Sequence, residues 1–279
     1  MSDATSREFM TPRDGELGLR TLSNPAGLAI SALPNGAIFS ITHRPEKGAP
    51  VMINQVLGAP IEGGIGRIWL RVGGANPFVA QLVGPRAKVA FADDENQFAW
   101  DGETNGIAHK VSLRLDAGAT RWSWRIEVTN LGDSAIPCDV VLAQDLGLGG
   151  RGFLMGSEAY ASQYIDHRAV EHPAFGPVVL SRQNHSQGGR FPWHALGCVE
   201  GAVAFATDAI QLFGPAFRSR DEIDSPFGTD LPAKVWQHEL ACPALQSKPA
   251  TLASGATTNW TFFGHFVADH PLASSDADL

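Results

Sequence analysis

Apolar and polar residues alternate along most of this chain. In the segment 120–128, the even positions from 122 onward hold Trp, Trp, Ile and Val, whereas the odd positions hold Arg, Ser, Arg and Glu. Successive side chains of a strand point to opposite faces, so this alternation predicts a strand with one buried and one wet face. Segments 89–91 and 98–100 repeat the scheme on either side of an acidic tip at 93–96.

Turn signals separate the predicted strands. Pro34-Asn35-Gly36 lies between apolar segments, and Asp116-Ala117-Gly118 does the same further along. Proline presets the turn and glycine adopts positive φ without strain, so both stretches predict hairpins. The strands flanking these turns are expected at 28–33, 37–42, 111–115 and 120–128. Further strands are expected at 51–56, 67–72, 139–143, 178–181, 202–207, 234–241 and 258–267.

The pattern predicts an all-β fold. Only residues 158–165 offer a short helical possibility, and the 30 glycines and 18 prolines suit a fold with many turns. Closely spaced short strands between turn signals are typical of a β-sandwich or barrel. A large antiparallel sandwich is therefore expected over residues 16–270, with a frayed segment at 1–15. Between about 150 and 195 the strand rhythm breaks, and a long polar loop is expected there.

Charge and cysteine content narrow the class of protein. The net charge of −8 and the pI of about 5.5 argue against a nucleic-acid partner, which favours basic surfaces. The polar N-terminal residues contain no apolar run, so neither a signal peptide nor a membrane span is expected. Cys138, Cys198 and Cys242 are far apart in apolar segments. They are interpreted as buried free thiols, in keeping with a cytoplasmic protein.

The segment 157–193 carries the most distinctive chemistry. It contains both tyrosines of the chain and an amide- and arginine-rich run at 182–190 that closes on Phe191 and Trp193. Aromatic rings suit the C–H faces of sugars, and planar amide and guanidinium groups suit their hydroxyls. The same run, with Gly188-Gly189 at its centre, could instead cradle an anion or form a hydrogen-bonded loop that packs on the sheet.

No cofactor, metal site or catalytic pair is predicted. His167 and His172 are five residues apart, as are His265 and His270, and no Cys/His cluster supports either pair as metal ligands. Carboxylates also surround the aromatic segment in sequence, but nothing in the pattern places two of them across a scissile bond. They are Asp145, Glu158, Asp166, Glu171 and Glu239.

Two stretches of this region carry a family resemblance. Residues 158–167 read EAYASQYIDH, and residues 179–193 follow the pattern VLSRQNxxQGGxFPW. With CPALQ at 242–246 and FFGHFVADHP at 262–271, they resemble the amino-terminal region of glycoside hydrolase family 94 phosphorylases, nearest to those acting on 1,2-β-oligoglucans. The resemblance covers roughly residues 120–271.

The resemblance implies a supersandwich of the kind found in galactose mutarotases, followed in the family by a helical barrel that supplies the catalytic aspartate. Residues 271–279 would then begin the linker to this barrel, and no catalytic residue is expected within the chain, which by itself would be inactive. The implied partners are a β-glucan oligosaccharide, the barrel and a second copy in a homodimer. The side chains expected to contact sugar or an interface are Tyr164, His167, Arg182, Gln183, Asn184, Gln187 and Trp193.

The expected function is that of a non-catalytic sandwich domain in a phosphorylase acting on β-1,2-glucooligosaccharides. Two alternatives stay open. One is a free-standing carbohydrate-binding module. The other is an aldose 1-epimerase-like enzyme, in which His167, His185 or His265 would have to converge with Glu158 or Glu239 as acid and base.

Overall fold

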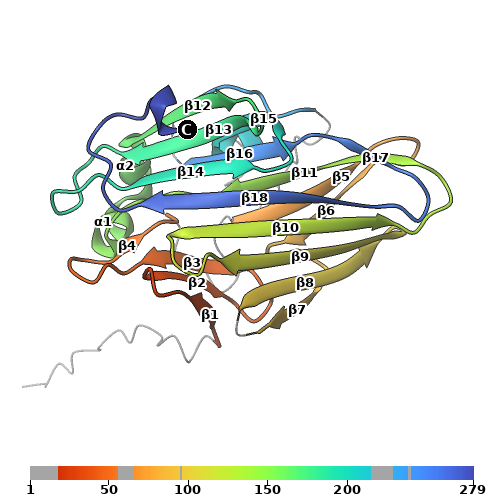
Figure 1. Ribbon diagram of the computed structural model, residues 1–279, viewed down its shortest axis with the longest axis horizontal. Coiled ribbons are helices and arrows are strands. Elements are labelled where there is room, and N and C mark those ends of the chain that lie inside the picture. Colours follow the sequence, from red (N-terminus) through yellow and green to blue (C-terminus); the bar gives the residue numbers. More distant parts are fainter. Residues whose placement is uncertain (1–17, 56–65, 95, 215–228, 238–239) are drawn as a thin grey trace, which may run out of the picture.

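The computed structural model describes residues 18–55, 66–94, 96–214, 229–237 and 240–279. Over these residues the chain forms antiparallel sheets of four, eight and six strands that enclose one main core (Figure 1). The four-stranded sheet consists, in order, of β1 (Arg20–Ser23), β2 (Leu28–Ala32), β3 (Ile38–His43) and β4 (Val51–Met52).

The two large sheets form the layers of the sandwich. The eight-stranded sheet runs in the order β12 (Ile165–His172), β13 (Gly176–Gln183), β14 (Trp193–Cys198), β18 (Thr257–Val267), β10 (Arg121–Asn130), β9 (Ile107–Leu115), β8 (Gln97–Thr104) and β7 (Ala90–Asp93). The six-stranded sheet runs in the order β15 (Ala202–Asp208), β16 (Ala241–Ser247), β11 (Ile136–Gln144), β5 (Gly66–Val72) and β6 (Phe78–Val83), and β17 (Ala250–Leu252) pairs with β11.

The alternation predicted for β10 places its apolar side chains between the two layers. Trp122, Trp124, Ile126 and Val128 are all buried in the main core, where the opposite sheet contributes side chains such as Leu142. The intervening polar residues of β10 lie on the outer face and are exposed or half-buried. Burial of apolar surface at this density drives the two sheets together, which confirms the predicted all-β sandwich.

Helices are short. They are α1 (Arg151–Gly156), α2 (Glu158–Gln163) and α3 (Ala209–Phe213), with a 3₁₀ turn at Asp276–Asp278. Only α2 was predicted from the pattern. The signal for α3 was present, since Asp208 and Gln211 form a capping box at its start, but the helix is too short to show a helical period.

The expectation of a long polar loop at 150–195 is wrong. This region contains α1, α2, β12, β13 and the start of β14, and only residues 184–192 connect strands as a loop. The strand pattern was obscured because β13 is buried on both faces and yet carries polar Ser181, Arg182 and Gln183 at its end. Polar residues such as these indicate a loop as long as their hydrogen-bond partners are unknown.

The predicted strand at 234–241 is also wrong. Residues 234–237 have no regular structure, and β16 begins only at Ala241. Instead, the Thr207 hydroxyl accepts from the Trp236 backbone N–H at 2.8 Å and donates to the Trp236 carbonyl at 2.7 Å. The Gln237 amide donates to the Gln163 and Ile165 carbonyls beside α2. Side-chain bonds therefore replace a strand ladder here.

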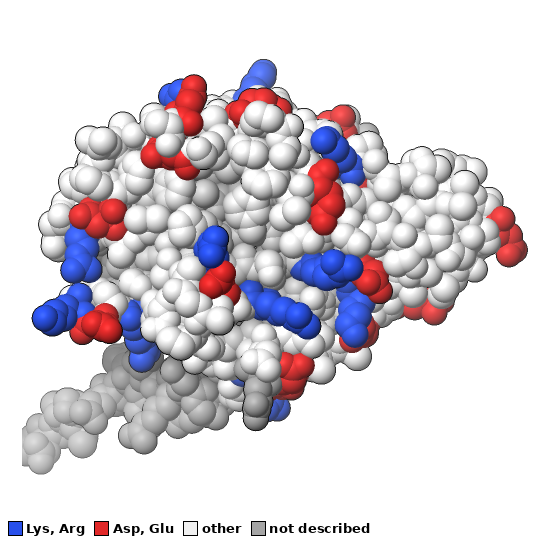
Figure 2. Space-filling view, viewed as in Figure 1, with Lys and Arg blue, Asp and Glu red and all other residues white. Residues whose placement is uncertain are grey.

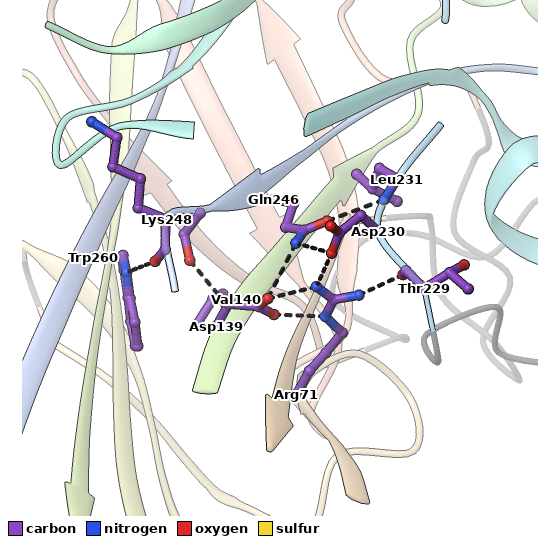
Figure 3. Close-up of polar contacts among 10 residues, drawn as sticks. Arg71, Asp139, Val140, Thr229, Asp230, Leu231, Gln246, Lys248 and Trp260 are labelled. Atoms are coloured by element: carbon purple, nitrogen blue, oxygen red, sulfur yellow. Dashed lines mark hydrogen bonds and ion pairs between the residues drawn. The ribbon is translucent and has the colours of Figure 1, made fainter. Parts of the chain in front are cut away.

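A polar network attaches residues 229–231 to the outside of the six-stranded sheet (Figure 3). The Arg71 guanidinium pairs with the Asp139 carboxylate at 2.6 Å and 2.5 Å and donates to the Thr229 carbonyl at 2.7 Å. Gln246 bonds Asp139 and Asp230 and accepts from the Leu231 backbone N–H. Burial opposes the charge of Arg71, but the hydrogen bonds and charges of Asp139 and Asp230 together outweigh it, so the pKa of Arg71 is raised.

Candidate functional site

The side chains expected to contact sugar or an interface gather at one end of the sandwich, where β12, β13 and β14 meet α1 and α2 (Figure 1). The structure divides them into a buried and an exposed group. His167, Arg182, Gln183 and Trp193 are buried, whereas Tyr164 and Gln187 are half-buried and Asn184 is exposed.

His167 belongs to a row of side chains that crosses the inner face of the large sheet. In register across β12, β13 and β14 lie His167, Ser181 and His194. The His167 ring bonds the Ser181 hydroxyl at 2.9 Å through Nδ1. Burial lowers the pKa of His167 to about 4, and burial with the charges of His265 and His167 lowers that of His194 to about 3. We define these residues as the histidine row; they face the core.

Gln183 makes hydrogen bonds to several segments at this end of the sandwich. Its amide nitrogen donates to the carbonyls of Gly147 at 3.2 Å and Ala161 at 3.3 Å. Its amide oxygen accepts from the His185 backbone N–H at 3.0 Å. A fully buried amide with these partners positions α2 and the 184–192 loop, so its role in the structure is to place the exposed residues around it.

Arg182 and Trp193 hold the C-terminal segment 270–279 against the outer face of the same sheet. The Arg182 guanidinium donates to the carbonyls of His270 at 2.7 Å and Pro271 at 3.0 Å, and also to Asn184 Oδ1. The Trp193 indole donates to Ser274 Oγ at 3.0 Å and stacks on the His270 ring with centroids 5.3 Å apart. The residues predicted to begin a linker thus fold back onto the sandwich.

The exposed group is centred on four aromatic rings, which we define as the aromatic corner: Phe153, Tyr160, Tyr164 and His185. Phe153 of α1 stacks on His185, with centroids 4.9 Å apart and an interplanar angle of 18°. Tyr160 and Tyr164, at the two ends of the last turn of α2, have centroids 4.9 Å apart and hydroxyl oxygens 3.0 Å apart. Tyr160 is 47% exposed, so the corner presents an aromatic surface to solvent.

A hollow of about 200 Å³ lies beside the aromatic corner. It is lined by Gly48, Ala49, Pro50, Val51, Gly150, Gln187, Gly188 and Arg190. Gln187 connects the hollow to the corner, because its Oε1 accepts from the Gly150 backbone N–H at 3.0 Å and its Nε2 donates to the His185 carbonyl at 3.0 Å. Gly150 is in turn the residue that precedes α1, which carries Phe153.

Phe153, Tyr160 and Arg190 were not among the residues predicted to contact sugar or an interface. For Tyr160 a signal was present, because residues 160 and 164 are four apart in a predicted helix and therefore share a face. Phe153 could not be selected, because α1 was not predicted. Arg190 lies in the run that was singled out, but only the structure places it opposite the Gly48–Val51 segment.

The histidines considered for an epimerase-like acid–base set lie on different faces and elements of the described structure. His167 points to the core, whereas His265 follows the opposite parity, because its neighbour Phe266 is the residue in register with His194. His185 lies in the aromatic corner, and Glu239 lies outside the described residues. Among the described residues there is also no group of three or more His, Cys, Asp or Glu side chains that could hold a metal ion.

Charges of both signs are interspersed on the face drawn in Figure 2, without a continuous basic stripe. This distribution, with the net charge of −8, lacks the electrostatic footprint that nucleic-acid binding favours. In the described part of the chain, no helix has the length and apolar character needed to cross a membrane.

Architecture and corner together define the class of protein: a large antiparallel β-sandwich whose short helices and aromatic residues gather at one end. The family can be named more narrowly. The model of the SOGP N-terminal domain matches residues 31–264, and the chain belongs to this family.

Known proteins extend this assignment. The chain is 32% identical over 250 residues to the 1,2-beta-oligoglucan phosphorylase of Listeria innocua serovar 6a, an alignment that covers 89% of this chain and 21% of the relative. A solved polysaccharide lyase shares the fold with a TM-score of 0.53 at 12% identity, covering 90% of this chain and 32% of the lyase. The GalM/aldose epimerase homologue from C. elegans aligns with a TM-score of 0.48 at 10% identity over 91% of this chain and 99% of its own.

These findings confirm the predicted resemblance to the amino-terminal domain of family 94 phosphorylases. The chain spans about a fifth of the length of the curated relative that it matches. At 12% identity and a TM-score of 0.53, the solved polysaccharide lyase shows a shared fold and nothing about the reaction.

Proposed function

We propose that this chain is the non-catalytic N-terminal sandwich of a cytoplasmic phosphorylase that acts on β-1,2-glucooligosaccharides. In this proposal a helical barrel carries out the phosphorolysis to α-glucose 1-phosphate and a shortened glucan. The sandwich supports that barrel, contributes to a homodimer interface and lends the loops at its α1–α2 end to the rim of the substrate cleft.

The observation that carries the proposal is the alignment with 1,2-beta-oligoglucan phosphorylase, which extends over 89% of this chain but only 21% of the relative. A similarity that spans nearly the whole chain supports an equivalent place in a larger enzyme.

The state of the cysteines supports the cytoplasmic part of the proposal. Cys138, Cys198 and Cys242 are all free and buried. Burial raises the pKa of Cys138 and of Cys198 to about 12, and the pKa of Cys242 is also raised by burial. Neutral, inaccessible thiols suit a reducing compartment, where disulfides are rare.

Phosphate-dependent turnover tests the function. The purified product of the complete reading frame, given phosphate and sophorose-type oligosaccharides, is expected to release glucose 1-phosphate, and residues 1–279 alone are expected to release none. A cellooligosaccharide of equal length serves as the linkage control. Turnover by residues 1–279 alone, or a complete protein active only on the β-1,4 control, would contradict the proposal.

The exposed aromatic corner favours one second candidate, a free-standing carbohydrate-binding module. This candidate predicts that the native protein in cells has the mass of residues 1–279, 29.7 kDa, and binds β-glucans unaided. A native mass several times larger would exclude it.

A further inference from the structure

The hollow beside the aromatic corner combines three features that one ligand class would use together. Part of its lining comes from the Gly48–Val51 segment and Gly150. The rest comes from the turn from Gln187 to Arg190, which contributes an amide and a guanidinium. The aromatic corner adjoins it through Gln187, which bonds both Gly150 and His185.

Glycine backbone lines part of the hollow, at Gly48 and Gly188. Gly188 and its neighbour Gly189 have φ of 63° and 86°, and a Cβ on either would meet no atom within 4 Å. Gly48 has φ of 114°, and a Cβ there would stand 3.5 Å from Arg190 Nη1. L side chains rarely adopt such positive φ values, so residues other than glycine would be strained at these positions.

The turn is held rigid by its own bonds. Gln187 N–H donates to the Arg190 carbonyl at 2.8 Å, and Gly189 N–H donates to Ser186 Oγ at 3.0 Å. Among the described residues, the Arg190 guanidinium makes one long hydrogen bond, 3.5 Å from Nη2 to the Lys47 carbonyl. A guanidinium carries five N–H donors and Arg190 is exposed, so donors remain for a ligand in the hollow that it lines.

The size and polarity of the hollow indicate the class of ligand that fits it. At about 200 Å³ the hollow is smaller than the roughly 300–1,000 Å³ of pockets for drug-sized ligands, and it suits a single ring. One guanidinium and one amide provide hydrogen bonds to hydroxyls, and the neighbouring rings of Phe153 and Tyr160 provide C–H contacts.

We propose that the hollow between Gly48–Val51 and Gln187–Arg190, with the aromatic corner beside it, is a subsite for one neutral pyranose ring of an oligosaccharide. Arg190 and Gln187 bond its hydroxyls, and the corner contacts an adjoining ring. The proposal deepens the proposed function and rests on it for the identity of the sugar as a β-glucan.

Amide NMR of ¹⁵N-labelled residues 1–279 tests the subsite, with sophorose as the probe. We expect saturable shifts of the Gly188 and Gly189 amides. Arg190→Ala is expected to weaken binding about tenfold, equivalent to about 1.4 kcal/mol, and Tyr160→Ala by a similar factor. Tyr160→Phe retains the ring and should retain most of the affinity.

Arg125→Ala is the matched control, since Arg125 is a half-exposed arginine of β10 with partners only at 3.3 Å and 3.8 Å. It should leave the affinity for sophorose unchanged. Inorganic phosphate is titrated separately. Equal shifts with phosphate alone, shifts confined to other parts of the chain, or no shifts at all would overturn the subsite.

Failure of the subsite and failure of the proposed function give different results. If the complete protein phosphorolyses β-1,2-glucans while residues 1–279 show no shifts and Arg190→Ala leaves KM unchanged, the subsite is wrong and the function stands. If sophorose binds at Gly188–Gly189 but the complete protein forms no glucose 1-phosphate, the subsite stands and the function is wrong.

Discussion

At the residue scale, two separate constraints require glycine at position 36. One is the turn that the sequence predicts, and the other is a packing contact that only the structure shows. Gly36 has φ of 81°, as the predicted Pro34-Asn35-Gly36 turn requires. Its carbonyl accepts from the buried Trp100 indole at 3.1 Å, and a Cβ at this position would lie 2.3 Å from the same nitrogen. The turn therefore joins the small sheet to the large one through a residue that cannot carry a side chain.

Gly36→Ala is expected to lower the free energy of unfolding by about 1–3 kcal/mol or more, because it adds left-handed strain and displaces Trp100. Urea denaturation followed by tryptophan fluorescence measures the change. Gly118→Ala is the control. A Cβ at Gly118 would meet no atom within 4 Å, and the φ of Gly118 is not in the positive range. Equal stability of the two variants would contradict this account.

At the element scale, the C-terminal segment depends on side chains of β13 and β14. Arg182 and Trp193 are buried and bond the segment directly, whereas the exposed pair Arg168–Asp276 contacts it from the edge strand at 2.6 Å. Hydrogen bonds from a buried charged group contribute more than an exposed ion pair, which is screened by water and salt.

Arg182→Gln is accordingly expected to release residues 270–279, because each lost charged hydrogen bond contributes about 1.5–3 kcal/mol. Amide hydrogen exchange of these residues should become at least tenfold faster. Arg168→Gln, the matched control, should accelerate exchange much less. An equal effect of both variants would show that Arg182 does not hold the segment.

At the scale of the whole molecule, the histidine row makes the sandwich sensitive to acid. His194 lies between the sheets, stacked on Trp122 with centroids 5.4 Å apart, and neither of its ring nitrogens has a partner among the described residues. Its pKa is lowered to about 3 and that of His167 to about 4, with burial as the main cause in both. The folded state therefore keeps both rings neutral.

Stability is expected to fall as the pH falls from about 6.5 toward 4. In this window the unfolded histidines bind protons that the folded ones do not, so the unfolding free energy decreases with acid, by roughly 3 kcal/mol for His167. Urea midpoints at several pH values measure the slope. His194→Phe should flatten it, and exposed His185→Gln should not. An unchanged slope in His194→Phe would exclude His194 as a source of the acid sensitivity.

The sequence by itself determined the all-β class, the hairpins at Gly36 and Gly118 and the inward face of β10. These features are local: a period of two, a turn residue with a required φ, and a neighbouring apolar run specify them. It also marked the 157–193 region as the place of interest, because tyrosines, amides and arginines were concentrated there. The family resemblance depended on the same residues.

Only the tertiary structure decided which of those side chains are buried and which are exposed. His167, Arg182, Gln183 and Trp193 each make a hydrogen bond to a residue that is 14 to 89 positions away, so no local pattern distinguishes them from surface residues. The hollow likewise needs the Gly48–Val51 segment, which lies far in sequence from Arg190. Burial and long-range pairing depend on the closed sandwich, and a polar residue reads the same in sequence whether its partner is water or the protein.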